Sequence, residues 1–318
     1  MVKVLLTGST GFLGSVLRSS LILQNKYKVV SAVRTISTGV THDTFVVGNI
    51  DSQTNYGEAL VGADVVVHLA ARAHIMKDEV SDPLAEYRKV NVNGTFNLAR
   101  QAAAAGVKRF IYLSSIKVNG ESTSGRSVFS DTDTPAPVDP YGLSKNEAED
   151  GLRQLSKETG MEVVIIRPPL VYGPGVKANF LNLLKLSSTG VPLPFGLVNN
   201  RRSMVYVGNL VDFIIRCIDQ PNAANETFLV SDGEDLSLRL LIGRIRSTLG
   251  RSALLLPVPL FVFQLAAALT GKRAVVDRLI GDLQVDSSKA RHLLNWTPPY
   301  TVKQGIAATV ADYIKRKP

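Results

Sequence analysis

The sequence is poor in cysteine, with Cys217 alone among 318 residues. A single cysteine excludes an intrachain disulfide framework and a cysteine-cluster metal site. We therefore expect no bound metal and a reducing compartment. A signal-peptide pattern is also missing, because Met1 runs directly into an apolar, strand-like segment. These absences predict a cytoplasmic protein.

Long apolar runs are missing as well. The longest apolar stretch, 253–270, is interrupted by Pro257, Pro259 and Gln264, which leaves too short a span for the ~30 Å of bilayer hydrocarbon. We expect a buried or amphipathic helix here and no transmembrane segment, while contact with a membrane surface stays open. The net charge of +9 is spread along the chain without a basic stripe that carries aromatics. That distribution favours a small anionic ligand over nucleic acid.

The pattern that is present is an alternation of strands and helices in the first half of the chain. Apolar, strand-like runs are separated by helix-like segments at 12–23, at about 83–105 and after Pro140. Continuous apolar strands between helices are typical of a parallel sheet buried on both faces. With right-handed crossovers, the sequence predicts an α/β fold with a doubly wound parallel sheet of the Rossmann type. The expected strands are 2–7, 27–33, 44–47, 64–69, 109–113 and 161–167.

A glycine-rich loop joins the first strand to the first helix. Gly8, Gly11 and Gly14 have the spacing G-x-x-G-x-x-G. Gly8 permits the tight turn, Gly11 allows close approach of a pyrophosphate, and Gly14 allows the helix to pack on the strand. The helix N-terminus then offers N–H groups to the phosphates. The predicted cofactor contacts in this loop are Gly8, Thr10, Gly11, Phe12, Leu13 and Gly14.

The end of the second strand indicates which dinucleotide is bound. An acidic residue there would bind the ribose 2′-hydroxyl of NAD. The sequence has Arg34 instead, with no carboxylate before Asp43. Since an arginine can hold the 2′-phosphate of NADP in a bidentate contact, NADP(H) is favoured, with NAD(H) as the alternative and a solvated surface arginine as the simpler interpretation.

The composition changes after Pro168, where proline and glycine become frequent. We predict a dinucleotide-binding domain over 1–168, to which 203–225 returns as a strand and helix. Residues 169–202 and 226–318 are predicted to form a smaller, C-terminal substrate-binding lobe.

A tyrosine and a lysine share one helix face after the fifth strand. Asp139 is placed to cap that helix, and Tyr141 and Lys145 lie four residues apart. A lysine ammonium beside a phenol is expected to lower the phenol pKa from ~10, which would let Tyr141 exchange a proton with a hydroxyl or carbonyl. Ser114 and Ser115 end the fifth strand, where a hydroxyl can hold the reacting oxygen.

With these motifs in this order, the chain resembles an extended short-chain dehydrogenase/reductase of the nucleotide-sugar epimerase/dehydratase family over essentially its whole length. The resemblance implies that Ser115 and Tyr141 are the catalytic pair and that Lys145 orients the cofactor. It also implies a homodimer paired through a four-helix bundle. The further positions that it assigns to the cofactor are Asn49, Ile50, Leu69, Ala70, Ala71, Asn91 and Pro168, with Asn49 standing where the family usually has aspartate.

The resemblance also implies substrate contacts in the lobe. Asn179 and Arg202 match positions that meet a diphosphate, and Phe195 matches a segment beside uracil. Arg278 lies one residue away from the place of a second arginine, which Leu279 occupies. The alternatives are a helix cap for Asn179, core packing for Phe195 and a surface charge for Arg202.

The resemblance narrows the reaction as well. Ile116 and Lys117 stand where dehydratases of the family carry Asp-Glu, so we expect no dehydration. A 4-ketoreductase and a 4-epimerase remain. The motifs 70–74, 114–120 and 167–180 are most similar to UDP-N-acetylquinovosamine dehydrogenases, which implies reduction of UDP-2-acetamido-2,6-dideoxy-4-hexulose, a UDP-linked amino sugar, in lipopolysaccharide O-antigen synthesis. The alternatives are a UDP-glucose or UDP-GlcNAc 4-epimerase and a non-catalytic NAD(P)-binding regulator.

The role of Arg34 can be tested by charge reversal. If Arg34 holds a 2′-phosphate, Arg34→Asp should weaken NADPH binding far more than NADH binding, because only NADPH carries that group. Titration of both reduced cofactors measures the difference. Equal losses would show that Arg34 is only a surface charge.

Overall fold

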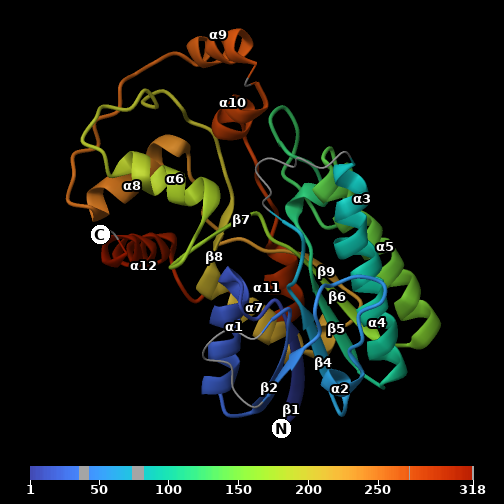
Figure 1. Ribbon diagram of the computed structural model, residues 1–318. Helices are drawn as coiled ribbons and strands as arrows, with labels where there is room; N and C mark the ends of the chain where they lie inside the picture. The colour runs from blue at the N-terminus through green and yellow to red at the C-terminus, as the bar shows by residue number, and fades with distance from the viewer. Residues whose placement is uncertain (36–42, 74–81, 272, 317–318) are drawn as a thin grey trace.

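A seven-stranded parallel sheet forms the centre of the molecule. The computed structural model describes residues 1–35, 43–73, 82–271 and 273–316. The strand order is β3-β2-β1-β4-β5-β6-β9, and every neighbouring pair is parallel (Figure 1). The chain direction across the sheet therefore reverses between β1 and β4, the point where doubly wound sheets bind ligands. The strands are β1 (Val2–Thr7), β2 (Tyr27–Val33), β3 (Thr44–Val46), β4 (Val65–His68), β5 (Arg109–Leu113), β6 (Glu162–Arg167) and β9 (Thr227–Leu229).

Helices cover both faces of the sheet, and successive strand residues bury their side chains on opposite faces. Leu6 packs with α1 and α7 on one face, whereas its neighbour Leu5 packs with α2, α4 and α5 on the other. This explains why the strands are continuously apolar. The helices of these layers are α1 (Phe12–Leu23), α2 (Gly57–Leu60), α4 (Thr95–Ala104), α5 (Pro140–Thr159), α7 (Val207–Asp219) and α11 (Ser288–Leu294).

The long helix expected at 83–105 is divided into three parts. α3 (Pro83–Tyr87) is followed by a π-helical segment, η1 (Arg88–Gly94), and then by α4. A π-helical segment widens the helix locally and is frequent at functional sites. Asn91, one of the expected cofactor residues, lies within it.

The remaining elements lie beyond the carboxyl ends of the strands, in a region that we call the lobe (Figure 1). It holds a separate pair of parallel strands, β7 (Leu170–Tyr172) and β8 (Met204–Tyr206). Within the described residues, no helix is both long and apolar enough to span a membrane. The other helices are α6 (Ala178–Ser187), α8 (Leu238–Thr248), α9 (Leu260–Thr270), α10 (Arg273–Ile280) and α12 (Val302–Lys315), with short 3-10 turns η2 (Ile116–Val118) and η3 (Pro221–Ala223).

The return of 203–225 to the main sheet occurs only in part. α7 packs on the sheet, with Leu210, Phe213 and Ile214 in the core beside α1. β8 does not join the sheet but pairs with β7. The strand that completes the sheet is β9, which was expected in the lobe; its three residues are too few to show a strand pattern in the sequence. The division into two lobes stays a prediction.

Candidate active site

The glycine loop turns between β1 and α1 with little room for side chains. Gly8 has a φ of +71°, and a Cβ on Gly14 would lie 2.0 Å from the carbonyl oxygen of Gly8. α1 begins after Gly11 without a side-chain cap and without an acidic residue in its first turn. Its first N–H groups and its positive dipole end therefore suit an anionic diphosphate. Thr10 and Gly11 are exposed, whereas Leu13 and Gly14 are buried.

Asn91 holds the loop after β4 in place. Its Oδ1 accepts a hydrogen bond from the Arg72 N–H at 2.8 Å, and its Nδ2 donates to the Arg72 carbonyl at 3.1 Å and to Ser144 Oγ at 3.0 Å. Asn91 thereby ties η1 to this loop and to α5. The preceding residues Leu69, Ala70 and Ala71 are half-buried at the carboxyl end of β4, beside the glycine loop: a Cβ on Gly8 would lie 2.8 Å from Ala70 N.

The expected adenosine contacts lie at the ends of β2 and β3. Arg34 is exposed directly after β2. Asn49 is exposed, and its carbonyl accepts a hydrogen bond from Thr54 Oγ1 at 2.5 Å. Ile50 packs against Gly94, where an added Cβ would lie 2.5 Å from Ile50 Cγ2. The segment 36–42 beside Arg34 lies outside the described residues, so preference for NADP stays a prediction.

Tyr141, Lys145 and Ser115 come together beyond β5. Asp139 caps α5 through Gly142 N–H at 2.7 Å, with Pro140 at the first helical position, as the sequence predicted. Tyr141 lies in the first turn of α5, close enough to Ser115 for the serine hydroxyl to oppose the rise in its pKa. Lys145, one turn later, donates from Nζ to the Leu113 carbonyl at 2.8 Å.

The expected effect of Lys145 on the phenol is wrong for the protein by itself. The Lys145 Nζ lies 5.9 Å from the centroid of the Tyr141 ring. Burial raises the pKa of Tyr141 well above its ordinary value, and the negative charge of Asp139 adds to this. Burial also lowers the pKa of Lys145 to about 7, although Glu149 opposes the change. Desolvation therefore outweighs the attraction that the four-residue spacing suggested.

The two positions expected to carry Asp-Glu in dehydratases carry an isoleucine and a lysine here. Ile116 is buried in a small apolar cluster. Lys117 forms ion pairs with Asp139 and, at 3.1 Å, with Glu121. The Ile116 N–H is held by the Pro168 carbonyl at 3.0 Å. Neither side chain offers a carboxyl group for acid–base elimination.

A chain of ion pairs connects this region to the arginines of the lobe. Glu121 also pairs with Arg278 Nε at 3.2 Å. Arg202 donates from Nη1 to the backbone carbonyls of Arg278 at 2.7 Å and Gly281 at 3.1 Å, and burial lowers its pKa. The structure thus brings together Arg202 and Arg278, two of the expected substrate residues. A half-buried guanidinium that bonds to carbonyls retains a positive field that suits a diphosphate.

The other two substrate residues are placed differently. Phe195 is buried and its ring stacks on Phe263, with 5.7 Å between centroids, so the core-packing alternative describes its side chain. Asn179 is exposed in the first turn of α6. It does not cap that helix, because the cap position is Lys177 and makes no side-chain cap bond. A ligand contact at either position stays a prediction.

Comparison with known proteins decides the family. Residues 4–231 match the model of the NAD dependent epimerase/dehydratase family. The chain belongs to this family.

Two relatives and one solved structure show the range of similarity within the family. A UDP-glucose 4-epimerase of Vibrio cholerae is 50% identical over 98% of this chain and 96% of its own length. The N-acetyl-alpha-D-glucosaminyl-diphospho-ditrans,octacis-undecaprenol 4-epimerase of Escherichia coli O157:H7 is 31% identical over 97% and 94%. The UDP-glucuronic acid 4-epimerase of Bacillus cereus, solved with UDP-glucuronic acid and NAD, matches with a TM-score of 0.78, 25% identity and 99% coverage of both chains. These similarities do not support the finer resemblance to UDP-N-acetylquinovosamine dehydrogenases.

In this member of the family, a buried carboxylate that the sequence reasoning missed lies behind Lys145. Glu149, one turn further along α5, is completely buried. Its oxygens accept hydrogen bonds from Ser114 Oγ at 2.5 Å and from Nε and Nη2 of Arg167 at 2.9 and 2.5 Å. Arg153 adds a bond at 2.8 Å. The signal in the sequence was an acidic residue four positions after Lys145, together with an arginine that ends an otherwise apolar strand.

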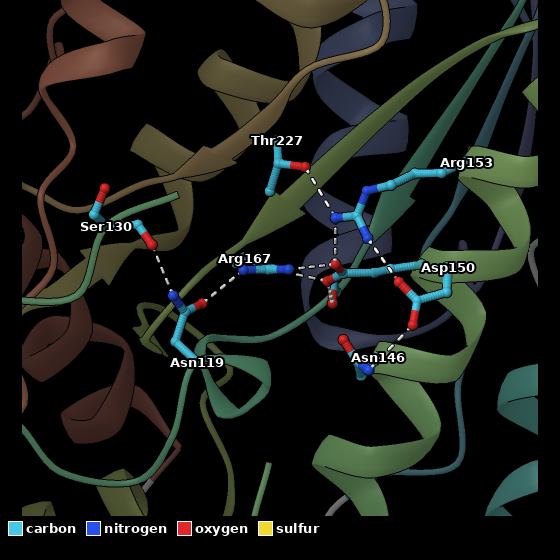
Figure 2. A network of polar contacts seen from close by, with 9 residues as sticks. Asn119, Ser130, Asn146, Asp150, Arg153, Arg167 and Thr227 are labelled. Carbon is cyan, nitrogen blue, oxygen red and sulfur yellow. Dashed lines mark hydrogen bonds and ion pairs between the residues drawn. The ribbon is translucent and has the colours of Figure 1, made fainter. Parts of the chain in front are cut away.

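Figure 2 shows how the network extends from α5 to Asn119, Ser130 and Thr227. Arg167 Nη1 donates to Asn119 Oδ1 at 2.9 Å, and Asn119 Nδ2 donates to the Ser130 carbonyl at 2.8 Å. Arg153 also bonds Thr227 Oγ1 at 3.2 Å, at the start of β9. The network therefore fixes β5, β6, β9 and α5 relative to one another. No group of His, Cys, Asp and Glu within the described ranges is arranged to hold a metal ion.

Removal of the buried charge should be costly. Glu149→Gln leaves Arg167 buried without a counter-charge, so we expect a loss of about 3–5 kcal/mol in the free energy of unfolding. Glu147→Gln is the matched control on the same helix, because Glu147 pairs with the half-exposed Arg88 and exposed pairs contribute only about 0–1 kcal/mol. Urea unfolding of both variants measures the difference. Equal losses would contradict a special role for the Glu149 pair.

Lys145 should make stability depend on pH. Its pKa is about 7 in the folded protein and about 10.4 when unfolded, so between these values only the unfolded chain holds the proton. Below pH 7 both states hold the proton, and the buried ammonium lowers the free energy of unfolding by its full amount. This loss becomes smaller as pH rises from 7 toward about 10.4. Lys145→Met should raise the melting temperature most near pH 6, with a gain that shrinks toward about pH 10. The control is Lys157→Met, an exposed position on the same helix. A gain independent of pH would contradict this assignment.

Proposed function

We propose that this protein is an NAD-dependent 4-epimerase of a UDP-hexose, with UDP-glucose and UDP-GlcNAc as candidate substrates. The observation that carries the proposal is the 50% identity, over nearly the whole of both chains, to a protein named as a UDP-glucose 4-epimerase. Ile116 and Lys117 support it, because they leave the site without the carboxyl pair of the dehydratases.

The proposed chemistry uses groups that the fold already holds together. The glycine loop and the N-terminus of α1 would hold NAD, which would supply the hydride acceptor and donor for reaction at sugar C4. Ser115 Oγ and the Tyr141 phenol would form hydrogen bonds with the oxygen on sugar C4. In its phenolate form, Tyr141 would remove the hydroxyl proton and give it back when the opposite configuration forms. Lys145 and Asn91 keep α5 and the loop after β4 in position.

Arg202 and Arg278 are proposed to bind the diphosphate. They come from different elements of the lobe, yet they lie side by side and are connected to α5 through Glu121 and Lys117. Binding of a diphosphate here would place its sugar toward the carboxyl ends of the strands. Charge-assisted bonds from two guanidinium groups are well suited to that ligand.

Reduction of the 4-keto amino sugar is the second candidate, and Arg34 at the end of β2 is the observation that favours it. The two reactions differ in their use of cofactor. An epimerase interconverts its substrate without net consumption of cofactor, whereas the reductase consumes one reduced cofactor for each product. NADPH use would then accompany reduction.

Turnover assays distinguish the epimerase from the reductase. We expect the purified protein to interconvert UDP-glucose with UDP-galactose, or UDP-GlcNAc with UDP-GalNAc, without loss of added NADPH or NADH. Tyr141→Phe should lower the rate about 10²- to 10⁴-fold, the usual contribution of proton transfer, while the control Tyr300→Phe keeps it. Stoichiometric oxidation of NADPH by the 4-keto UDP-sugar, with no epimerisation, would overturn the proposal in favour of the reductase.

A further inference from the structure

Helix α9 is predominantly apolar, yet most of its side chains are exposed. Its sequence, LFVFQLAAALT, contains no charged residue. Phe261 is 65% exposed, Leu265 59% and Leu269 81%. Figure 1 shows the helix at the outer end of the lobe, beside α10 and away from the main sheet. Contiguous apolar exposure of this kind marks an interaction surface.

Four of the large exposed apolar side chains of α9 share one face. At 100° per residue, Phe261, Val262, Leu265 and Leu269 fall within an arc of about 100°. Phe263 and Ala267 lie on the opposite face, where Phe263 stacks on Phe195 and Ala267 is buried. The inner face of α9 therefore anchors the helix to the lobe, and the outer strip is left uncovered by the described residues.

The sequence that contains α9 carries an excess of positive charge. Residues 236–276 contain no Asp or Glu but six Lys and Arg. Arg273 is exposed just beyond the end of α9. Arg239 and Arg244 line a hollow of about 630 Å³ together with Leu240 and Leu255. Arg244 pairs with Glu234 at 2.5 Å, so Arg239 supplies the unbalanced charge there. Apolar and cationic side chains thus occur together both at α9 and in this hollow.

Charge complementarity favours an anionic lipid surface as the binding partner of the outer face of α9. An anionic lipid surface offers acyl chains to the apolar strip and negative headgroups to the arginines. A second copy packed two-fold on this face would bring cationic segments together. The eleven residues of α9 extend about 16 Å, roughly half of the ~30 Å hydrocarbon core, so the helix would lie in the interface.

We propose that the outer face of α9 and its flanking arginines form a docking surface for anionic membranes. Because the neighbouring α10 carries Arg278, docking holds the substrate-binding side of the lobe near the lipid headgroups. The inference does not depend on which reaction the protein catalyses.

Vesicle sedimentation tests the apolar part. The full chain should pellet with phosphatidylcholine vesicles that contain phosphatidylglycerol, and binding should fall with added salt. Leu265→Glu should weaken binding at least about tenfold, because it places a charge in the apolar interface. Leu23→Glu, at a position 79% exposed at the end of α1, is the matched control and should bind like the wild type.

The cationic part has its own pair of variants. Arg273→Glu should weaken binding roughly 5- to 30-fold, since each basic residue near an anionic surface adds attraction and the new carboxylate repels. Arg291→Glu, exposed on α11, changes the net charge equally and should have little effect. UDP-sugar turnover in solution should stay unchanged in all four variants, which separates lost docking from lost folding.

Three results would overturn the proposal. Wild-type protein that fails to pellet with the anionic vesicles contradicts it directly. Equal binding to vesicles of pure phosphatidylcholine removes the role of charge. If Leu265→Glu instead converts a dimer to a monomer in analytical ultracentrifugation and vesicle binding is absent, the strip joins two copies of the chain.

Discussion

The buried ion pair between Glu149 and Arg167 holds the candidate site together. Both side chains are removed from water, and charges in such a place persist only when their hydrogen-bonding capacity is met. Glu149 receives bonds from β5, β6 and its own helix, and Arg167 continues to Asn119. The position of α5 on the sheet, and with it the position of Tyr141 and Lys145, follows from this requirement.

The same burial sets the electrostatics of the site. Lys145 and Tyr141 lie where water is largely excluded, so the charged form of each is disfavoured. Glu149 supports the ammonium from one turn away but does not restore its ordinary pKa. Burial of Lys145 costs stability, because the folded protein must either desolvate the ammonium or release its proton.

Lys117 joins α5 to the lobe through two ion pairs. Where dehydratases carry a carboxyl group, this chain has a cation that pairs with the cap of α5 and with Glu121. Glu121 in turn holds Arg278, whose carbonyl receives Arg202. Lys117 and Glu121 therefore connect the cap of α5 to Arg278 and, through its carbonyl, to Arg202 in the lobe.

The sequence by itself determined the sheet, the glycine loop and the helix that carries Tyr141, because each depends on local patterns: apolar runs, glycine spacing, and Asp139 followed by Pro140. The tertiary structure decided what depends on contacts between distant segments. β9 is too short to be seen without its partner β6. Phe195 is a core residue because distant segments, Phe263 among them, pack around it, and Glu149 is neutralised because β6 brings Arg167 to it. The pKa values of Tyr141 and Lys145 could not be predicted from the sequence for the same reason. Spacing along a helix shows which groups are neighbours, but it does not show how far the rest of the fold excludes water from them.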